Sequence, residues 1–292
     1  MSKTVVIAGA GHAAGQVIAS LRQHEFDGRI VLVGDEPYFP YQRPPLSKKF
    51  LAGEMPAERL YFKPESFYQG VDVHLETRIA AIDREAGCVM TNAGETIAYD
   101  KLVLALGSRV RRLPVEGADL PGVHYLRNIA DVKGIRKDLD KGKSLVVIGA
   151  GYIGLEVAAV AQQAGLDVTV LETEDRVMSR VVSPEVSDFY QIQHTNHGVK
   201  LRLATSATSI DGKRRVRAVT TSAGESVPAD LVVIGVGIVP NTELAIEAGL
   251  EVDNGIIVDE RCVTSDPDIY AVGDCTLHPN GIYDRNLRLE SV

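Results

Sequence analysis

Residues 4–11 read Thr-Val-Val-Ile-Ala-Gly-Ala-Gly, and residues 144–151 read Ser-Leu-Val-Val-Ile-Gly-Ala-Gly. Each stretch begins with an apolar, β-branched run, which is typical of a strand buried on both faces of a parallel sheet. Each continues into an alanine-rich, helix-favouring stretch, residues 13–22 and 152–164. A second apolar run follows the helix in both copies. Two parallel strands must be joined by a crossover connection, and the helix between the two runs supplies it. The sequence therefore predicts two βαβ units about 140 residues apart.

The two halves also end alike. Residues 100–107 (Asp-Lys-Leu-Val-Leu-Ala-Leu-Gly) and 230–235 (Asp-Leu-Val-Val-Ile-Gly) both predict a buried strand that stops at glycine. Polar alternating segments, residues 91–97 and 216–227, predict small antiparallel hairpins or meanders. We therefore expect an α/β fold with two similar three-layer domains. We place the first at residues 1–110, the second at 111–238, and a return to the first at 239–292.

Length and composition exclude several classes of protein. A chain of 292 residues corresponds to about two domains. Net charge is −8, which argues against nucleic-acid binding as the main function. The apolar stretch 144–155 is too short to cross a membrane. Three widely spaced cysteines fit a reducing, cytoplasmic compartment and no metal site, and the N-terminus enters the first strand with no room for a secretory signal.

The second glycine-rich turn has the pattern Gly149-x-Gly151-x-x-Gly154 between a strand and a helix. Its glycines allow a tight turn, close approach of a pyrophosphate and close packing of helix on strand. The pyrophosphate would lie at the positive end of the helix. Glu172, at the end of the next strand, can accept hydrogen bonds from a ribose diol and would repel a 2′-phosphate. This half therefore predicts an NAD site that prefers NADH over NADPH.

The first glycine-rich turn has Gly9, Gly11 and, at the third position, Ala14, which the dinucleotide-binding pattern allows. Either Asp35 or Glu36 would hold the ribose. One such turn is weak evidence, because tight strand-to-helix turns occur in many α/β proteins. Two copies, each with a strand, a helix and an acidic residue in place, predict two dinucleotides. A mobile nicotinamide and a tightly held flavin are the simplest pair.

Four further segments carry a resemblance to a known family: residues 40–48 (Pro-Tyr-Gln-Arg-Pro-Pro-Leu-Ser-Lys), 149–156, 237–241 and 270–274. The chain resembles the FAD-dependent pyridine nucleotide-disulfide oxidoreductase superfamily. Within it, the chain is similar to the NADH-dependent ferredoxin reductases of the putidaredoxin reductase-like type, which serve haem monooxygenases and aromatic-ring dioxygenases. The resemblance implies an FAD enzyme, a ferredoxin-type iron–sulfur partner, and a monomer or weak dimer.

The resemblance also implies a fold of two Rossmann-like domains, one for FAD and one for NAD, followed by a C-terminal interface domain. That third domain would add about a hundred residues. This chain ends at Val292, inside a segment similar to the start of an FAD-contacting helix. We therefore expect the interface domain to be absent from this chain. A further departure is Leu106, which replaces the threonine usual in the family and lacks its hydroxyl.

The resemblance assigns roles to particular residues. It places Lys48 near the reactive ring of the flavin and Glu156 near the nicotinamide, which makes this pair the candidate catalytic residues. Asp274 would hold the ribityl chain, and Arg112, or its neighbour Arg111, would face the flavin. The implied FAD-binding residues are Gly9, Gly11, His12, Ala13, Ala14, Asp35, Glu36, Arg43, Lys48, Ala105, Gly107, Arg112 and Asp274. The implied NAD-binding residues are Gly149, Gly151, Tyr152, Ile153, Gly154, Glu156, Glu172, Gly235 and Gly237.

Residues 40–55 contain no cysteine, and none of the three cysteines has a neighbour in sequence for thiol exchange. Disulfide reduction is therefore disfavoured, and electrons would leave the flavin directly. A flavin accepts the two electrons of NADH together and releases them singly, which suits an iron–sulfur acceptor. Other interpretations are an NADH oxidase, a redox-sensing flavoprotein similar to apoptosis-inducing factors, and a flavin-free binding module.

Two further patterns allow more than one interpretation. His194 and His197 have the spacing of a metal-binding pair on a helix, but Gly198 follows directly and favours a helix C-cap. Basic clusters at residues 109–112 and 213–217 could bind an acidic ferredoxin, although a solvated surface is the commoner meaning, above all for the second cluster.

Overall fold

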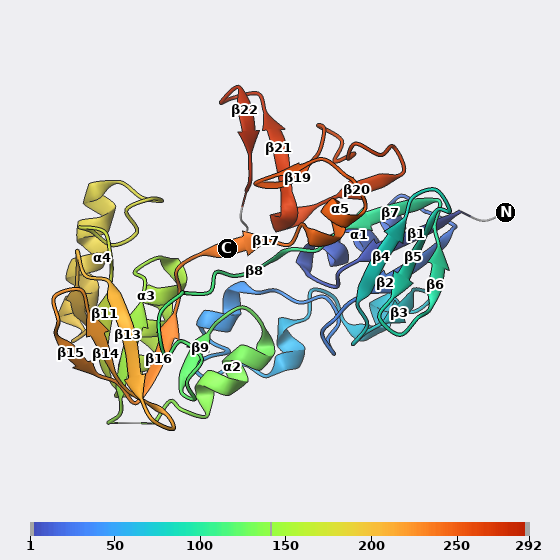
Figure 1. The fold of residues 1–292 in the computed structure, drawn as a ribbon. Helices are drawn as coiled ribbons and strands as arrows, with labels where there is room; N and C mark the ends of the chain where they lie inside the picture. The colour runs from blue at the N-terminus through green and yellow to red at the C-terminus, as the bar shows by residue number, and fades with distance from the viewer. Residues whose placement is uncertain (1–2, 141, 290–292) are drawn as a thin grey trace. The chain divides into compact units, whose positions relative to one another are not determined.

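The computed structural model describes residues 3–140 and 142–289 (Figure 1). Residues 290–292, in the segment similar to the start of an FAD-contacting helix, lie outside the described residues. The chain forms two compact units: unit 1 takes residues 1–42, 60–109 and 239–292, and unit 2 takes residues 43–59 and 110–238. The sequence analysis placed residues 43–59 in the first domain. They lie in unit 2 because the short 3-10 helix Pro44–Ser47 packs against helices of that unit.

Unit 1 is built on a parallel five-stranded sheet in the order β20-β7-β1-β2-β3. Its strands are β1 (Thr4–Ala8), β2 (Arg29–Val33), β3 (Asp72–His74), β7 (Lys101–Leu104) and β20 (Ile269–Ala271). Successive side chains of a strand point to opposite faces. Val6 and Ala8 therefore enter one core, and Val5 and Ile7 enter another. Both faces of β1 are buried, as its unbroken apolar run predicts.

A helix covers one face of this sheet and strands cover the other. Helix α1 (His12–Gln23) buries Ala14 and Ile18 against the face that carries Val5 and Ile7. On the opposite face lies an antiparallel sheet of β4 (Ile79–Asp83), β5 (Cys88–Thr91) and β6 (Thr96–Ala98). The remaining elements of unit 1 are α5 (Glu243–Glu247), β18 (Val252–Asp253), β19 (Gly255–Ile257), β21 (Thr276–Asn280) and β22 (Arg285–Leu287). Helix α1, the parallel sheet and the antiparallel sheet β4–β6 are thus the three layers expected from the sequence.

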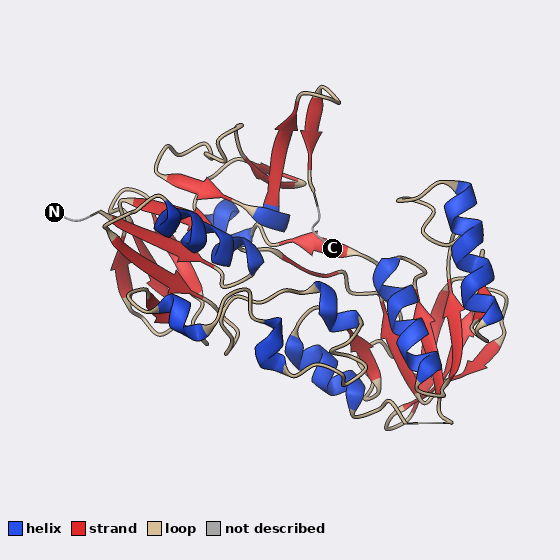
Figure 2. Ribbon diagram, turned by 180° about the vertical axis from the view of Figure 1, so that it is seen from behind, coloured by secondary structure: helices blue, strands red, loops and turns tan. Residues whose placement is uncertain are grey.

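Unit 2 repeats this plan with a parallel sheet in the order β12-β11-β10-β16-β9. Its strands are β9 (Val123–Tyr125), β10 (Ser144–Ile148), β11 (Asp167–Leu171), β12 (Lys200–Arg202) and β16 (Leu231–Ile234). Helix α3 (Tyr152–Gln163) packs against β10 and β11, and α2 (Ile129–Arg136) packs against β9. Helix α4 (Pro184–Asn196) lies beside β12 (Figure 2).

The third layer of unit 2 is also an antiparallel sheet, made of β13 (Ala207–Gly212), β14 (Val216–Thr221) and β15 (Ser226–Pro228). Val146 and Ile148 of β10 pack in one core with Ile210, Val219 and Val227 of this sheet. The chain crosses between the units in β8 (Ser108–Val110) and β17 (Ile238–Pro240), which pair with each other. The sequence had placed the first crossing in residues 109–127.

The two parallel sheets begin with the same contact. Asp100, just before β7, accepts a hydrogen bond through Oδ2 from the backbone N–H of Thr4 (2.6 Å). Asp230, just before β16, accepts one from the backbone N–H of Ser144 (2.9 Å). Each aspartate thus satisfies the first donor of the central strand. The repeat noticed in the sequence therefore extends to individual hydrogen bonds.

An ion cluster joins α2 to the strand layers of unit 2. Asp138 Oδ2 lies 2.8 Å from His124 Nε2, and its Oδ1 lies 2.6 Å from Arg215 Nη2. Burial alone would raise the pKa of Asp138, but the hydrogen bonds from His124 and Arg215 outweigh it and hold the pKa below its ordinary value. Arg215 belongs to the basic cluster 213–217, whose basic residues are all exposed, and it pairs with Asp138 from the surface.

We expect Asp138→Asn to lower the free energy of unfolding at pH 7 by about 1–2 kcal/mol. A depressed pKa contributes stability above the ordinary pKa of Asp, and that stability is lost as the pH falls through the folded-state pKa. The gap between wild type and variant should therefore close below about pH 4. Urea unfolding over a pH series measures it, with the exposed Asp140→Asn as control. A gap that persists unchanged at pH 3 would contradict this assignment.

Candidate functional site

The two glycine-rich turns have the same geometry. Gly9 follows β1 with φ +103°, and Gly149 follows β10 with φ +105°, a region that L side chains rarely adopt. A β-carbon at Gly9 would lie 2.3 Å from the carbonyl oxygen of Ala105, and one at Gly149 would lie 2.4 Å from that of Gly235. Only glycine fits either position. The third glycine, Gly154, is also enclosed, because its β-carbon would lie 2.0 Å from the carbonyl oxygen of Gly149.

Both turns leave a helix N-terminus open. Gly11 caps α1 and Gly151 caps α3, and neither helix has a side-chain cap or an acidic residue in its first turn. A β-carbon on either cap residue would meet nothing within 4 Å. The first N–H groups of a helix have no partner inside the helix and attract anions. Each turn is therefore a cradle that a diphosphate fits. His12, Ala13 and Ala14 form the first turn of α1, and Tyr152 and Ile153 begin α3.

The acidic residue of unit 2 is already held in place. Glu172 follows β11 directly and accepts a hydrogen bond through Oε2 from the backbone N–H of Ala150 (2.6 Å). Its Oε1 accepts from Thr173 Oγ1 and from the backbone N–H of Glu174, both at 3.0 Å. A carboxylate offers about four acceptor positions. Three are used, so Glu172 is fixed beside the glycine-rich turn and keeps one position for a ligand.

Unit 1 differs at this point. The backbone N–H of Gly9 bonds the carbonyl of Val33, as that of Gly149 bonds the carbonyl of Leu171, so Gly34 occupies the place of Glu172. A β-carbon there would lie 2.3 Å from the β-carbon of Ala10. The acidic residues Asp35 and Glu36 come one and two places later. Asp35 is exposed, whereas Glu36 is half-buried and accepts a hydrogen bond from the Tyr41 hydroxyl (2.6 Å).

The structure brings Lys48 and Glu156 together in unit 2. Two prolines at the start of the helix Pro44–Ser47 preset its backbone, and Lys48 forms its C-cap. Lys48 Nζ lies 2.8 Å from Glu156 Oε1 and 3.1 Å from the carbonyl oxygen of Pro44. The hydroxyl of Ser47, which is fully buried, donates to Glu156 Oε2. Both oxygens of a carboxylate in the second turn of an otherwise apolar helix are thus engaged, which is what such a carboxylate requires.

Sequence reasoning missed Ser47, although it stands inside the motif that drew attention to Lys48. The contact joins residues 109 positions apart. Its only sequence signal is a hydroxyl residue next to the lysine. Ser47 therefore becomes a candidate site residue only through the tertiary structure.

Asp274 lies in the short 3-10 helix Gly273–Cys275, which follows β20, and is 8% exposed. Ser108 Oγ donates a hydrogen bond to its Oδ2 at 3.1 Å. Asn241 holds the same segment, because its Nδ2 donates to the carbonyl of Leu106 (2.8 Å) and its backbone N–H donates to that of Gly107 (3.0 Å). The departure at Leu106 thus leaves a hydroxyl two residues later, at Ser108. Sequence reasoning missed it because the family motif ends at Gly107.

Other predicted site residues lie in less distinctive surroundings. Arg43 Nη1 donates to the carbonyl of Arg127 at 2.6 Å. The guanidinium carbon of Arg112 lies 4.4 Å from the ring centroid of Tyr125, in a cation–π contact. Gly237 has φ +101° and open space where a β-carbon would be. The described contacts of Arg43 and Arg112 hold loops of unit 2, and their roles toward a flavin stay predictions.

The family model for pyridine nucleotide-disulphide oxidoreductases matches residues 3–290. The chain belongs to this family. Rhodocoxin reductase of Rhodococcus erythropolis is 47% identical over 99% of this chain and 68% of its own length. Putidaredoxin reductase of Pseudomonas putida is 44% identical over 99% of this chain and 70% of its own length. The structure of a ferredoxin reductase from Rhodopseudomonas palustris matches with a TM-score of 0.96 at 45% identity. The match covers 99% of this chain and 72% of that one. A putidaredoxin reductase–putidaredoxin complex also has a TM-score of 0.96.

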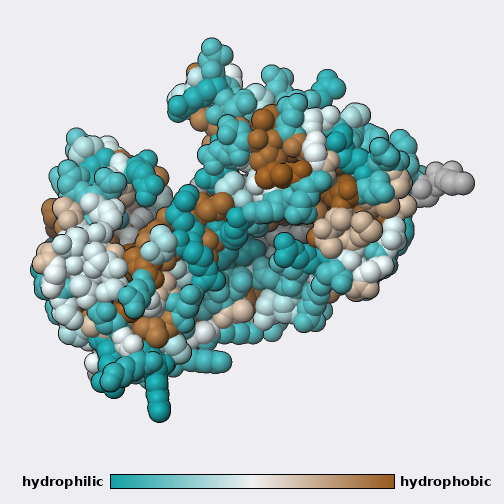
Figure 3. Space-filling model, in the orientation of Figure 1, coloured by the Kyte–Doolittle hydropathy of each residue, from teal (hydrophilic) through white to brown (hydrophobic). Residues whose placement is uncertain are grey.

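These matches confirm the resemblance and the expected α/β fold of this oxidoreductase. No helix among residues 3–140 and 142–289 is long and apolar enough to cross a membrane. Much of the face drawn in Figure 3 is hydrophilic, with smaller apolar patches between. That surface accords with a net charge of −8.

The three cysteines of this oxidoreductase are free thiols, and two of them are shielded by burial. Burial raises the pKa of Cys275 to about 11, and that side chain is fully buried. Burial also raises the pKa of Cys262. The thiolate is the reactive form of cysteine, so both thiols are inert near pH 7. Thiol exchange at these two positions is therefore disfavoured, as the sequence predicted.

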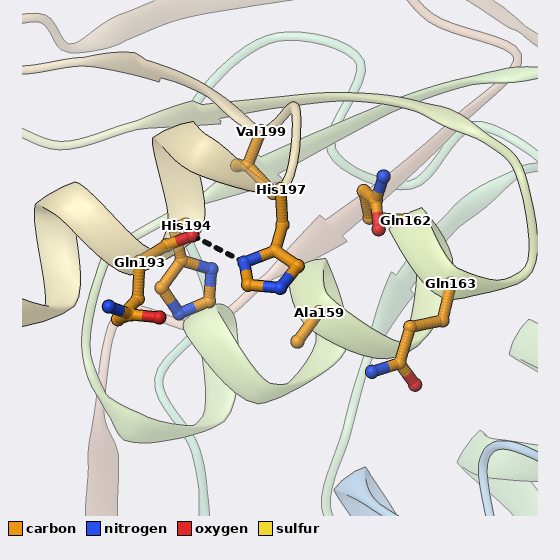
Figure 4. A pocket seen from close by; sticks show the side chains of 7 residues that line it. All are labelled: Ala159, Gln162, Gln163, Gln193, His194, His197 and Val199. Atoms are coloured by element: carbon orange, nitrogen blue, oxygen red, sulfur yellow. Dashed lines mark hydrogen bonds between the residues drawn. The ribbon is translucent and has the colours of Figure 1, made fainter.

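The histidine pair lies at the end of α4. His197 is the C-cap of the helix, its Nδ1 lies 2.7 Å from the carbonyl oxygen of Gln193, and Gly198 has φ +91°. The C-cap interpretation is confirmed. Figure 4 shows both histidine rings at a cavity of about 180 Å³, facing Gln162 and Gln163 of α3. Burial, and secondarily His197, lower the pKa of His194. Among the described residues, no three His, Cys, Asp or Glu side chains form a group that could bind a metal ion.

Proposed function

We propose that this chain is an FAD-dependent NADH reductase that delivers electrons to a one-electron iron–sulfur protein. The observation that carries the proposal is the pair of matching cradles, each an open helix N-terminus behind a glycine that no other residue can replace. Relatives named as rhodocoxin, putidaredoxin and rubredoxin reductases support the acceptor class. A ferredoxin-type protein that feeds a monooxygenase or dioxygenase is the partner we propose.

Unit 1 would hold FAD. The open N-terminus of α1 would bind the pyrophosphate through Gly11 and the residues after it, and Glu36, with Asp35 beside it, would accept the ribose hydroxyls. Buried Asp274 suits the ribityl hydroxyls, because a buried carboxylate needs hydrogen-bond donors. FAD supplies the conversion between the two electrons of NADH and the single electrons of the acceptor. The surrounding residues bind and orient the two dinucleotides.

Unit 2 would hold NADH. The start of α3 would bind its pyrophosphate, Glu172 its adenosine ribose, and Gly235 and Gly237 would border the nicotinamide half. Glu156, in the second turn of α3, forms a fixed polar cluster with Ser47 and Lys48 of the segment packed against that helix. We assign Lys48 and Glu156 to the nicotinamide end, where they would set the position and the local charge of the reacting ring.

We expect Glu172→Arg to reduce the ratio of kcat/KM for NADH to that for NADPH by about ten- to a hundred-fold. The change removes a carboxylate acceptor and supplies a cation for a 2′-phosphate, and a hydrogen bond to a charged group contributes about 1.5–3 kcal/mol. Glu172→Gln removes the charge but keeps an acceptor for the N–H of Ala150, so it distinguishes the effect of the charge from the effect of a change in loop conformation. Glu251→Arg, at an exposed position of unit 1, is the control. An unchanged ratio in Glu172→Arg would remove Glu172 from the ribose site.

A second candidate is an NADH oxidase, favoured by a water-forming NADH oxidase of Lactobacillus brevis with a TM-score of 0.90 at 26% identity. An anaerobic titration distinguishes the two functions. NADH should bleach the flavin absorbance of the FAD-loaded protein, and an oxidised [2Fe–2S] ferredoxin should restore it at a rate that oxygen does not match. Oxygen uptake that equals NADH consumption without ferredoxin would favour the oxidase.

We also propose a cytoplasmic location and a monomer or weak dimer. Three free thiols with no disulfide among them are typical of a reducing compartment, and this supports the location. Sedimentation at several protein concentrations would test the oligomeric state.

A further inference from the structure

The loop that joins β11 to α4, residues 172–183, turns its first cationic side chain inward. Arg176 Nη2 donates to the carbonyl of Ser179 at 2.6 Å, and Nη1 donates to the carbonyl of Val182 at 3.0 Å. Nη1 also donates to Ser187 Oγ at 2.9 Å. The guanidinium therefore holds the backbone of its own loop and the first turns of α4.

Ser187 connects the loop to α4. It is the buried residue of this helix and is fully enclosed. Its hydroxyl accepts from Arg176 and donates to the carbonyl of Val177. Gln191, one turn later, accepts from the backbone N–H of Val177 through Oε1 (3.3 Å). Both backbone groups of Val177 are thus bound by side chains of α4, which fixes the middle of the loop.

The other side of the loop reaches the dinucleotide cradle. The backbone N–H of Met178 donates to the carbonyl of Ala150 at 3.0 Å, and Met178 has φ +50°. The N–H of the same alanine donates to Glu172. Ala150 lies between Gly149 and Gly151, so both of its backbone groups are bound by this loop. Ser187 is thus linked through Val177 and the adjacent Met178 to Ala150, and through Ala150 to Glu172. Arg176 supports this path from the side, because it bonds Ser187 and the carbonyl of Ser179, the residue after Met178.

The charges displayed by the loop follow from this arrangement. Residues 172–175 include three carboxylates, on Glu172, Glu174 and Asp175, and the last two are exposed. The next residue is Arg176, whose guanidinium is occupied inside the loop. A 2′-phosphate brings a charge of about −1.5 to −2 near pH 7. Near Glu172 it would meet these carboxylates and, directly after them, an arginine that is already engaged; the exposed Arg180 lies further along the loop.

We propose that Arg176, held by Ser187, is a positioning residue that determines the preference for NADH over NADPH. It fixes Glu172 and the glycine-rich turn in the form that binds a ribose diol, and it keeps its own guanidinium away from the 2′ position. This inference rests on the proposed function of unit 2 as the NADH site.

The test uses Ser187→Ala and Arg176→Gln in the FAD-loaded protein, with ferricyanide as the one-electron acceptor. We expect the KM for NADH to rise about tenfold while kcat stays within twofold. The KM for NADPH should stay constant or fall, so the preference for NADH falls about tenfold. Arg214→Gln, at an exposed arginine of unit 2 outside this loop, should leave the preference unchanged. An equal rise of both KM values would show general loosening and would overturn the proposal, as would an unchanged preference.

A binding measurement separates this inference from the proposed function. Calorimetry compares adenosine 5′-diphosphoribose with its 2′-phosphorylated form and needs no electron transfer. If wild type binds the unphosphorylated form more tightly and Ser187→Ala or Arg176→Gln narrows the difference about tenfold, the inference stands even where NADH oxidation fails. If both variants bind the two ligands as wild type does, the inference fails while the proposed function stands. Thermal unfolding identifies a variant that does not fold. In that case the result with the other variant decides whether the inference stands.

Discussion

Replacing Lys48 by methionine should reduce the turnover number for NADH oxidation by the FAD-loaded protein about a hundred-fold. The Lys48 ammonium lies 2.8 Å from Glu156, and the variant keeps the length of the side chain but removes the charge and the donors. Glu156 would then keep Ser47 as a partner on only one oxygen. A misplacement of about 1 Å at a reacting centre costs about a hundred-fold in rate, and loss of one preorganised donor costs a similar amount.

Lys49→Met provides the matched control, because Lys49 is the exposed neighbour in the same segment. Stopped-flow measurement of flavin bleaching by NADH reports the step directly. A second variant, Glu156→Gln, keeps the shape of the side chain and loses its charge. If Lys48 and Glu156 act as a unit, the double variant should be no slower than the slower single variant. A rate for Lys48→Met within threefold of wild type would exclude this pair from the reaction.

The parts of the fold that sequence reasoning reached are those with local signals. The runs at residues 29–33 and 167–171 form strands with those bounds, and the two predicted helices begin and end within one residue of their places. Apolar runs, glycine turns and acidic strand ends each depend on a few adjacent residues. Three-residue strands such as β3 and β12 have no such signal, because pairing with a neighbouring strand defines them. They were therefore missed.

The candidate site divides in the same way. Gly9, Gly149 and Glu172 stand where the spacing predicted, because each belongs to one βαβ unit. Ser47 and Ser108 act on residues 109 and 166 positions away, and only the folded chain brings those pairs together. The choice between Asp35 and Glu36 stayed open because a glycine occupies the position that corresponds to Glu172. A motif thus places a residue at a strand end but does not identify its partner.

Asp274→Ala should abolish FAD retention through gel filtration, whereas wild type should keep its flavin. Asp274 lies in the 3-10 helix after β20 in unit 1, is nearly enclosed, and accepts a hydrogen bond from Ser108 through Oδ2. An ionised carboxylate in such a place is costly unless hydrogen-bond donors surround it, and ribityl hydroxyls are suitable donors. Loss of one or two charge-assisted hydrogen bonds of about 1.5–3 kcal/mol each weakens binding about tenfold to ten-thousand-fold.

Three further variants separate this role from a structural one. Asp253→Ala removes an exposed carboxylate of the same unit and should keep the flavin. Ser108→Ala removes the donor to Asp274 while leaving the carboxylate, and it should weaken FAD binding by about tenfold or less, because a single neutral partner is lost. Asp274→Asn keeps the volume and one acceptor, so it should retain more FAD than Asp274→Ala. Because all four proteins should fold with the same circular dichroism spectrum, a flavin ratio that stays at the wild-type value in Asp274→Ala would show that the ribityl chain binds elsewhere.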